Sequence, residues 1–401
     1  MYVRLAKRCK LIYLNGINMV GCPLSHVIFG LTEEGFEFVR SVKEGRDVNV
    51  DSLSEDIKQL FEAMIEKGFF QDDMPEVGNK SAYLHITSRC NMNCVGCYSN
   101  SGCNQETVVN EMSVKQIFHI VDNLTESGFN SIVVSGGEPF LYNEINEIFR
   151  YMKSKGCNVA CITNGTASEA TYISSLKYID TLSFSMDGLD EKTSVLRYNT
   201  AKKIDGLIKI LRGRETVIRI IFTLHKKNYH LYQEMQTYAK SLGVPYNFSL
   251  FTAEKNNRND EYLLGDEELI ELSEQFDSGT DIMDSSFNPV LSCSTCCGAG
   301  KTLVSISATG DIYPCHMMHQ REFLMGNALK DKISCVAGKI SPYGYFPVYK
   351  KTDCKDCEYA YLCGGGCLYR AYALSGNLES KEQLCSLYKQ QIDRILAPFT
   401  K

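Results

Sequence analysis

The 401-residue chain lacks the features that mark several classes of protein. It has no apolar run of the roughly 18 to 20 residues that a membrane span needs, and Asn15, Gly16 and Asn18 interrupt the apolar stretch near the N-terminus. It has no excess of basic residues, because 42 Lys and Arg stand against 48 Asp and Glu, a formal net charge of -6. That balance disfavours a general nucleic-acid or anionic-membrane surface. We therefore expect a cytoplasmic protein with no nucleic-acid or membrane partner.

The remaining composition is that of a globular protein, with one exception. Hydrophobic residues make up 44% and charged residues 22%, which excludes disorder, collagen and coiled coil as the main state. The length predicts two or three domains. The exception is a total of 18 cysteines. Without a signal peptide these should be reduced thiols, and a reduced chain rich in cysteine indicates metal ligation first and surplus buried thiols second.

The first 75 residues are expected to form a small winged-helix-like module, followed by a linker at residues 71–80. Its pattern is two strands and then two helices, which end where glycine interrupts the periodicity. The expected elements are strands at residues 11–14 and 27–29, a helix capped by Thr32 and ended by Gly45, and a helix opened by Asp51 and ended by Gly68.

Residues 81–252 alternate short β-rich runs with amphipathic stretches, which predicts an α/β fold with a parallel sheet, open or closed into a partial barrel. Active groups should then lie at the carboxyl ends of the strands. Residues 253–292 are expected to bridge to residues 293–401, which are dense in Cys and Gly and need metal to hold them together. The expected strands are residues 82–87, 131–135, 158–163, 181–186, 217–223 and 246–250.

Three cysteines follow the first of these strands as Cys90-x3-Cys94-x2-Cys97, with Tyr98 next. Three thiolates on one loop leave a coordination position free, which suits a cluster or metal that must bind a ligand directly. The alternatives are a zinc knuckle without its fourth ligand, or buried thiols. The spacing resembles the signature of the radical S-adenosylmethionine (radical SAM) enzymes. The resemblance implies a partial (β/α)6 barrel with a [4Fe-4S] cluster that chelates SAM and cleaves it to a 5'-deoxyadenosyl radical.

Other strand ends carry further matches to that family. Gly136, Gly137, Glu138 and Pro139 resemble the element that binds the SAM amino group, and the glycines let a ligand approach the backbone closely. The resemblance also implies SAM contacts from Arg197, whose planar fork suits a carboxylate. The remaining residues assigned to SAM binding are Tyr98, Asn164 and Ser185.

A second constellation follows the pattern Cys-x12-Gly-x4-Cys, a gap, Cys-x2-Cys-x5-Cys-x3-Cys, a gap, and Cys. Seven spaced cysteines can build two metal centres if one more ligand is supplied, and two structural zinc sites are the alternative. The pattern resembles the SPASM domain of radical SAM enzymes, which carries two auxiliary [4Fe-4S] clusters and would bring the total to three. The resemblance implies a first auxiliary set of Cys293, Cys297, Cys315 and Cys367, and a second of Cys354, Cys357, Cys363 and Cys385. Cys296 could replace Cys293, or one iron could stay open for a substrate thiolate.

Two further residues bear on the reaction. Cys161, on the third expected strand, is a candidate hydrogen-atom donor next to the barrel interior. His316 follows Cys315 where sulfatase-activating relatives have a catalytic Asp, which disfavours that activity.

The N-terminal module resembles the peptide-recognition element at the front of enzymes that modify ribosomally made peptides. An exposed strand edge can accept an extended leader peptide by β-augmentation. The alternative, a DNA-binding winged helix, is disfavoured because residues 1–80 contain 10 Lys and Arg against 13 Asp and Glu.

Together these resemblances imply a peptide maturase that uses an external low-potential electron donor and leaves an oxidative crosslink, foremost a thioether. Alternatives in the same class are a carbon-carbon crosslinking maturase, an epimerising maturase and an anaerobic sulfatase-maturing enzyme. An alternative of another class is a non-enzymatic iron-sulfur or zinc winged-helix regulator.

Overall fold

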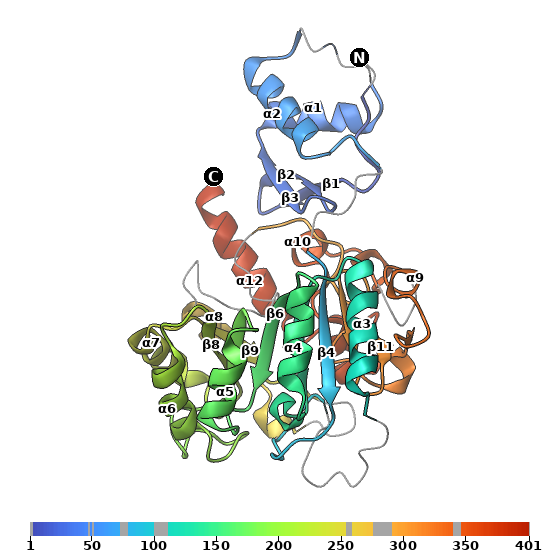
Figure 1. Cartoon of the computed structure of the whole chain (residues 1–401). Coiled ribbons are helices and arrows are strands. Elements are labelled where there is room, and N and C mark those ends of the chain that lie inside the picture. The colour runs from blue at the N-terminus through green and yellow to red at the C-terminus, as the bar shows by residue number, and fades with distance from the viewer. Residues whose placement is uncertain are drawn as a thin grey trace.

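The computed structural model describes residues 3–46, 49, 52–72, 79–99, 111–253, 259–275, 291–339 and 346–400. These residues form one three-stranded and one nine-stranded sheet. Figure 1 shows the small sheet and its two helices as a separate unit beside the larger sheet. No helix within the described ranges is long and apolar enough to cross a membrane.

The N-terminal unit has three strands, where the sequence predicted two. The missed strand lies in the expected turn region, because Asn15 and Gly16 have positive φ angles of 54° and 80° and reverse the chain in two residues. Leu14 and Ile17 are directly paired across that turn. The order is β1-β2-β3, and both helices are confirmed. The elements are β1 (Lys10–Leu14), β2 (Ile17–Cys22), β3 (Val27–Leu31), α1 (Glu33–Lys43) and α2 (Glu55–Glu66). Thr32 caps α1 as expected, whereas Ser54 precedes α2 and Asp51 lies outside the described residues.

Both faces of the small sheet contribute side chains to a hydrophobic cluster. On one face Val20 packs with Phe38 and Phe61 of the two helices. On the other face Ile12 belongs to a cluster with Ile392 of the C-terminal helix. Alternate residues therefore bind the N-terminal unit to its own helices and to the C-terminal part of the chain.

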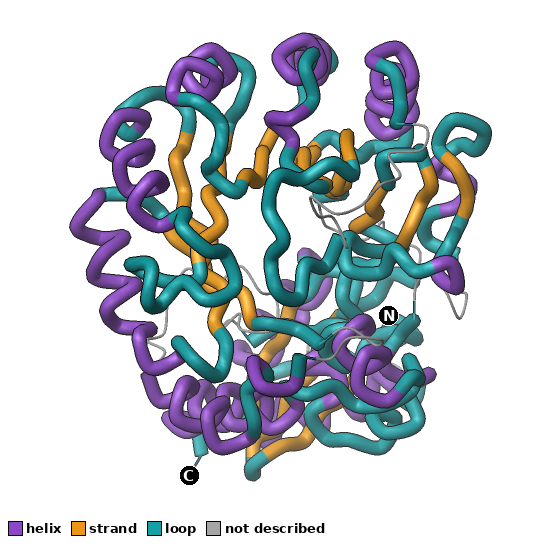
Figure 2. The backbone as a smooth tube through the Cα atoms, turned by 90° about the horizontal axis from the view of Figure 1, so that it is seen from below, coloured by secondary structure: helices purple, strands orange, loops and turns teal. Residues whose placement is uncertain are grey.

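The large sheet contains the six strands that the sequence predicted, and these strands are parallel to one another. They are β4 (Ser81–Thr87), β5 (Ser131–Gly136), β6 (Asn158–Thr163), β7 (Thr181–Met186), β8 (Val217–Leu224) and β9 (Tyr246–Leu250). The connecting helices are α3 (Val114–Glu126), α4 (Ile145–Ser154), α5 (Glu169–Leu176), α6 (Ala201–Leu211) and α7 (Tyr232–Leu242). Figure 2 shows helices along the outside of the curved sheet. Because the six strands are parallel, their carboxyl ends lie on the same side of the sheet.

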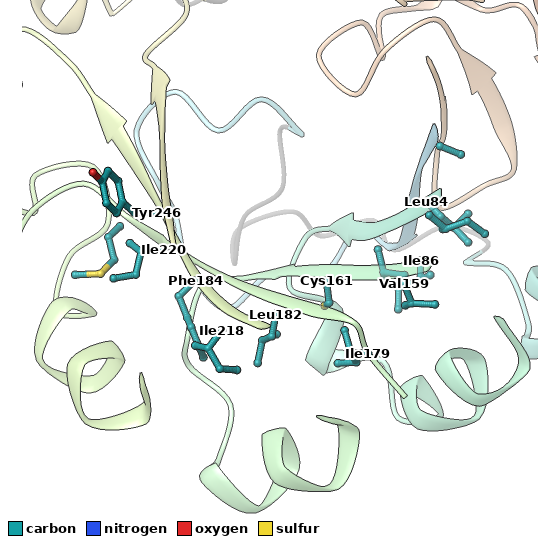
Figure 3. Close-up of a cluster of buried hydrophobic side chains, with 14 of the residues drawn as sticks. Leu84, Ile86, Val159, Cys161, Ile179, Leu182, Phe184, Ile218, Ile220 and Tyr246 are labelled. Atoms are coloured by element: carbon teal, nitrogen blue, oxygen red, sulfur yellow. The ribbon is translucent and has the colours of Figure 1, made fainter. Parts of the chain in front are cut away.

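The main hydrophobic core lies between this sheet and its helices. Leu84, Leu182 and Ile220 point into it from three strands (Figure 3). Cys161 points into the same cluster and is 0% exposed. This placement argues against the hydrogen-donor role, because strand alternation turns the Cys161 thiol away from the barrel interior.

The C-terminal part extends the large sheet, which the sequence did not predict. Its strands are β10 (Leu303–Ile306), β11 (Asp311–Tyr313) and β12 (Gly326–Asn327), and β10 pairs in parallel with β4. The full order is β12-β11-β10-β4-β5-β6-β7-β8-β9. Strands of two to four residues leave too short a pattern to recognise in a sequence. The helices are α8 (Asp266–Gln275), α9 (Ile333–Val336), α10 (Ala360–Cys363), α11 (Leu368–Ser375) and α12 (Cys385–Leu396).

Candidate active site and auxiliary cysteine sets

The loop after β4 brings Cys90, Cys94 and Cys97 together. All three thiols are half-buried. Burial raises the pKa of Cys94 to about 11; Cys97 and Cys90 act in the same direction, and Arg197 opposes them. A metal ion is the partner that would favour the thiolate form in such a place. The three thiols and the free position therefore fit a [4Fe-4S] cluster with one open iron.

The Gly136-Gly137 pair lets the loop after β5 lie directly on the cysteine loop. The Gly137 amide donates to Thr87 O at 2.9 Å, and the Glu138 amide donates to Arg89 O at 2.8 Å. A Cβ on Gly137 would lie 1.9 Å from Arg89 O. Any side chain at Gly137 would therefore displace the cysteine loop.

Glu138 ties the loops after β5 and β6 together. Its buried carboxylate accepts from Thr163 Oγ1 at 2.7 Å and from the amides of Asn164 at 2.8 Å and Phe140 at 3.2 Å. Burial raises the pKa of Glu138 to about 7, against the effect of these hydrogen bonds. The Glu138 carboxylate therefore holds the loops after β5 and β6 in position. Pro139 follows it and begins a short 3-10 turn.

The other SAM-binding candidates lie around the cysteine loop. Asn164 Nδ2 lies 3.9 Å from Cys90 Sγ, and the Tyr98 hydroxyl is 2.9 Å from Ser135 Oγ. Ser185 lies on β7, one residue before its carboxyl end. The geometry therefore assembles the predicted residues at one end of the sheet.

Arg197 has a partner that the sequence analysis did not identify. Its guanidinium donates to Thr223 Oγ1 at 3.2 Å and lies 3.9 Å from Asp187 Oδ1, which is fully buried. Asp187 also accepts from the Leu196 amide at 2.6 Å. The buried carboxylate therefore fixes the segment that presents Arg197.

The structure also groups three histidines, of which the sequence had drawn attention only to His316. The His85 ring, on β4, lies 4.5 Å from the His319 ring and 6.1 Å from that of Tyr98. His316 stacks on Tyr83 at 4.1 Å. Burial lowers the pKa of His319 to about 3 and that of His85 well below its usual range, so both rings are neutral at pH 7. Only the inward register of β4 could have indicated His85.

Three of the four cysteines assigned to the first auxiliary set meet in the structure. Burial raises the pKa of Cys315, and Cys367 and Cys297 add to the effect. Cys293 does not join them. A Cβ on Gly21 of β2 would lie 2.6 Å from Cys293 Sγ, and the Cys293 amide lies 3.4 Å from His26 O.

Cys293 therefore faces the N-terminal unit, and its role as an auxiliary ligand is not supported. Burial raises its pKa to about 12, and the cysteine that adds to this shift is Cys22. Cys296, by contrast, lines a cavity of about 200 Å³ together with Cys297 and Cys363. Of the two upstream cysteines, the geometry favours Cys296.

The second auxiliary set is complete. Its four thiols line one cavity of about 500 Å³. Burial raises the pKa of Cys363 to about 12, and the amide of Gly365 donates to Cys363 Sγ at 3.3 Å. In the described part of the chain, no three His, Cys, Asp or Glu side chains are grouped as they would be around a single metal ion. A set of four cysteines matches the ligands of a [4Fe-4S] cluster. The set consists of Cys354, Cys357, Cys363 and Cys385.

Comparisons with known proteins agree with this geometry. Residues 84–235 match the model of the radical SAM superfamily. The AdoMet-dependent heme synthase of Methanosarcina barkeri is 25% identical over 75% of this chain and 94% of that protein. The subtilosin biosynthesis protein AlbA of Bacillus subtilis is 23% identical over 77% of this chain and 71% of that protein.

A solved structure shares the fold over nearly the whole length. Streptococcus suis SuiB, bound to its precursor peptide SuiA, aligns with a TM-score of 0.62 and 16% identity over 96% of this chain and 99% of that one. A match of that extent includes most of the N-terminal unit. Residues 84–235 are therefore a radical SAM domain, and the chain that carries it is a radical SAM enzyme.

Proposed function

We propose that this enzyme is a peptide maturase that oxidatively crosslinks a ribosomally made precursor peptide, foremost through a thioether bond. One observation carries the proposal: a radical SAM site, two further cysteine sets and a small sheet with an open edge occur in one chain. AlbA is named for subtilosin biosynthesis, and SuiB binds a precursor peptide. Both names support a peptide substrate here.

The residues at the carboxyl ends of the strands have distinct tasks. Cys90, Cys94 and Cys97 would hold a [4Fe-4S] cluster, which together with SAM supplies a 5'-deoxyadenosyl radical. Arg197, held by Asp187, offers a planar donor pair to the SAM carboxylate. The glycines beside Glu138 let the backbone of the cysteine loop pack directly on the loop after β5.

A thioether requires an electron acceptor in addition to the radical. Joining a C–H carbon to a thiol sulfur removes two hydrogens in all. One leaves as a hydrogen atom taken by the radical, and the other leaves as a proton and an electron. The auxiliary cysteine sets would hold the [4Fe-4S] clusters that accept this electron, with Cys296, Cys297, Cys315 and Cys367 as the first set.

The leader peptide would bind the N-terminal unit at β3. The β1 side of the small sheet contacts the C-terminal part of the chain, since Lys10 Nζ lies 5.1 Å from the Tyr361 ring and Asn15 Nδ2 donates to Asp393 Oδ1 at 2.7 Å. Within the described residues β3 pairs only with β2. Its free backbone groups could therefore accept an extended peptide as a fourth strand.

The experiment is to measure the mass of a precursor peptide encoded beside this chain after anaerobic co-expression, with thiol alkylation to count free cysteines. We expect a loss of two hydrogens and one alkylation site per thioether. Cys94→Ala should abolish both changes. Cys335→Ala is the matched control, because Cys335 is exposed and outside the three cysteine sets.

Other results would select the alternatives. A loss of two hydrogens with all thiols still alkylated would indicate a carbon-carbon crosslink. Deuterium uptake without a mass change in ordinary water would indicate epimerisation, and an aldehyde on a sulfatase peptide would indicate sulfatase maturation. If the purified protein forms no 5'-deoxyadenosine with SAM and a reductant, the enzyme proposal fails and the regulator remains.

A further inference from the structure

A lysine is buried beside the second auxiliary set. Lys351 is 1% exposed, and its ammonium group donates to Gly365 O at 2.6 Å. None of the ion pairs among the described residues includes Lys351. A buried ammonium without a carboxylate partner is costly and uncommon, so it calls for an anionic neighbour.

The hydrogen bonds of Lys351 lead to the second cysteine set. Gly365, which accepts from Lys351, donates its own amide to Cys363 Sγ at 3.3 Å. The Cys354 amide donates to Lys351 O at 3.1 Å. Hydrogen bonds therefore connect Lys351 to two residues of this set, to Cys363 through Gly365 and to Cys354 through the backbone.

The first auxiliary set has a buried cation whose charge is cancelled. Arg370 Nε lies 2.5 Å from Glu382 Oε2, with both side chains at most 4% exposed. Glu382 also accepts from the Cys367 amide at 2.7 Å. The arginine thus contributes little net charge to its set.

Glu382 also lines the cavity of the second set and is buried, but its charge is paired with that of Arg370. The remaining charged residues of the lining are exposed or half-exposed, which limits their effect because water and salt screen them. They are Asp353, Asp356, Glu358, Lys381 and Lys389. Lys351 is shielded from that screening. It therefore acts on the second set more strongly than its exposed neighbours do.

We propose that Lys351 raises the reduction potential of the cluster held by Cys354, Cys357, Cys363 and Cys385, which makes it the stronger electron acceptor of the two auxiliary clusters. One-electron reduction adds one negative charge to a cluster, and a fixed buried cation stabilises that reduced form. The inference rests on the proposed function, since it assumes a cluster at this set. Lys351 acts through the cluster and touches no substrate.

The test is an anaerobic redox titration of the complete, iron-loaded enzyme followed by electron paramagnetic resonance. The signal of the second auxiliary cluster is assigned by its loss in Cys357→Ala. Lys351→Met should move the potential of this signal to a more negative value, and Lys351→Arg should keep it close to that of the wild type. The signals of the other two clusters should not move.

Salt separates an electrostatic effect from a structural one. The shift caused by Lys351→Met should persist at high ionic strength because the charge is buried, whereas any shift from the exposed Lys381→Met control should disappear. If Lys351→Met does not retain its iron, Lys351→Gln is titrated in its place.

Two failures are distinguishable. If the wild type shows no second auxiliary signal, the cluster assignment and with it the proposed function are overturned. If the signal is present but Lys351→Met and Lys351→Gln leave its potential unchanged, or Lys351→Arg shifts it equally, only the role of Lys351 is overturned.

Discussion

Replacing Gly137 by alanine should separate the loops that form the radical SAM site. The new Cβ would lie 1.9 Å from Arg89 O and 2.9 Å from Ser88 O, which are backbone atoms and cannot rotate away. The amide hydrogen bonds from Gly137 to Thr87 and from Glu138 to Arg89 would then break. Two such bonds contribute about 2 kcal/mol, and relief of the overlap costs about 1 to 3 kcal/mol. The free energy of unfolding should therefore fall by about 3 to 5 kcal/mol.

Anaerobic urea unfolding of the iron-loaded protein measures this loss, and 5'-deoxyadenosine formation reports the state of the site. SAM cleavage should fall below detection in Gly137→Ala. The control is Gly206→Ala on α6, where nothing lies within 4 Å of the new Cβ. That variant should gain about 0.5 to 1 kcal/mol from helix propensity and keep its activity. A Gly137→Ala enzyme with wild-type stability and SAM cleavage would refute the reasoning.

Three further changes have definite expected outcomes. Burial of Glu138 should by itself cost about 3 kcal/mol of stability as the pH rises from about 4.5 to 7, because the folded pKa of this carboxyl lies above its unfolded value. Urea titrations at several pH values should show this difference between the wild type and Glu138→Gln, and parallel curves for the two would contradict it. Arg370→Met removes the cation that pairs with the buried Glu382 carboxylate, so chemical denaturation should show a loss of about 3 to 5 kcal/mol in the free energy of unfolding. A loss below about 1 kcal/mol would contradict the importance of this buried ion pair. Removal of iron by a chelator should make residues 346–400 sensitive to protease, while residues 111–253 stay resistant because they have a large hydrophobic core. Equal cleavage of both regions would show that metal does not hold the C-terminal part together.

The sequence allowed the barrel strands to be predicted almost to the residue, because each is a short apolar run between amphipathic helices. The strand at Asn158–Thr163, for example, has the bounds expected. Strand β2 was missed because the glycine and asparagine within it resemble turn residues, and β10 to β12 were missed because they are short and find their partners only in the folded sheet.

The cysteine ligands that are close together in the sequence were also easier to predict than those that depend on contacts between distant parts of the chain. Cys90, Cys94 and Cys97 lie within one loop, so they meet whatever the rest of the chain does. The choice between Cys293 and Cys296 depends on how residue 293 packs against Gly21, far away in the sequence. His85 was missed because a single histidine in a strand has no pattern of its own beyond the register of that strand.

The parallel pairing of β10 with β4 also affects how the protein is made. Leu303 pairs with Ser81, a residue that leaves the ribosome 222 positions earlier. Until Leu303 has been synthesised, β4 is an edge strand of the forming parallel sheet. Exposed edge strands can pair with strands of other chains. Pairings this remote in sequence close slowly, so the nascent enzyme should be most prone to aggregation just before its C-terminal cysteines emerge. Expression yield should therefore depend on iron and chaperone supply late in synthesis.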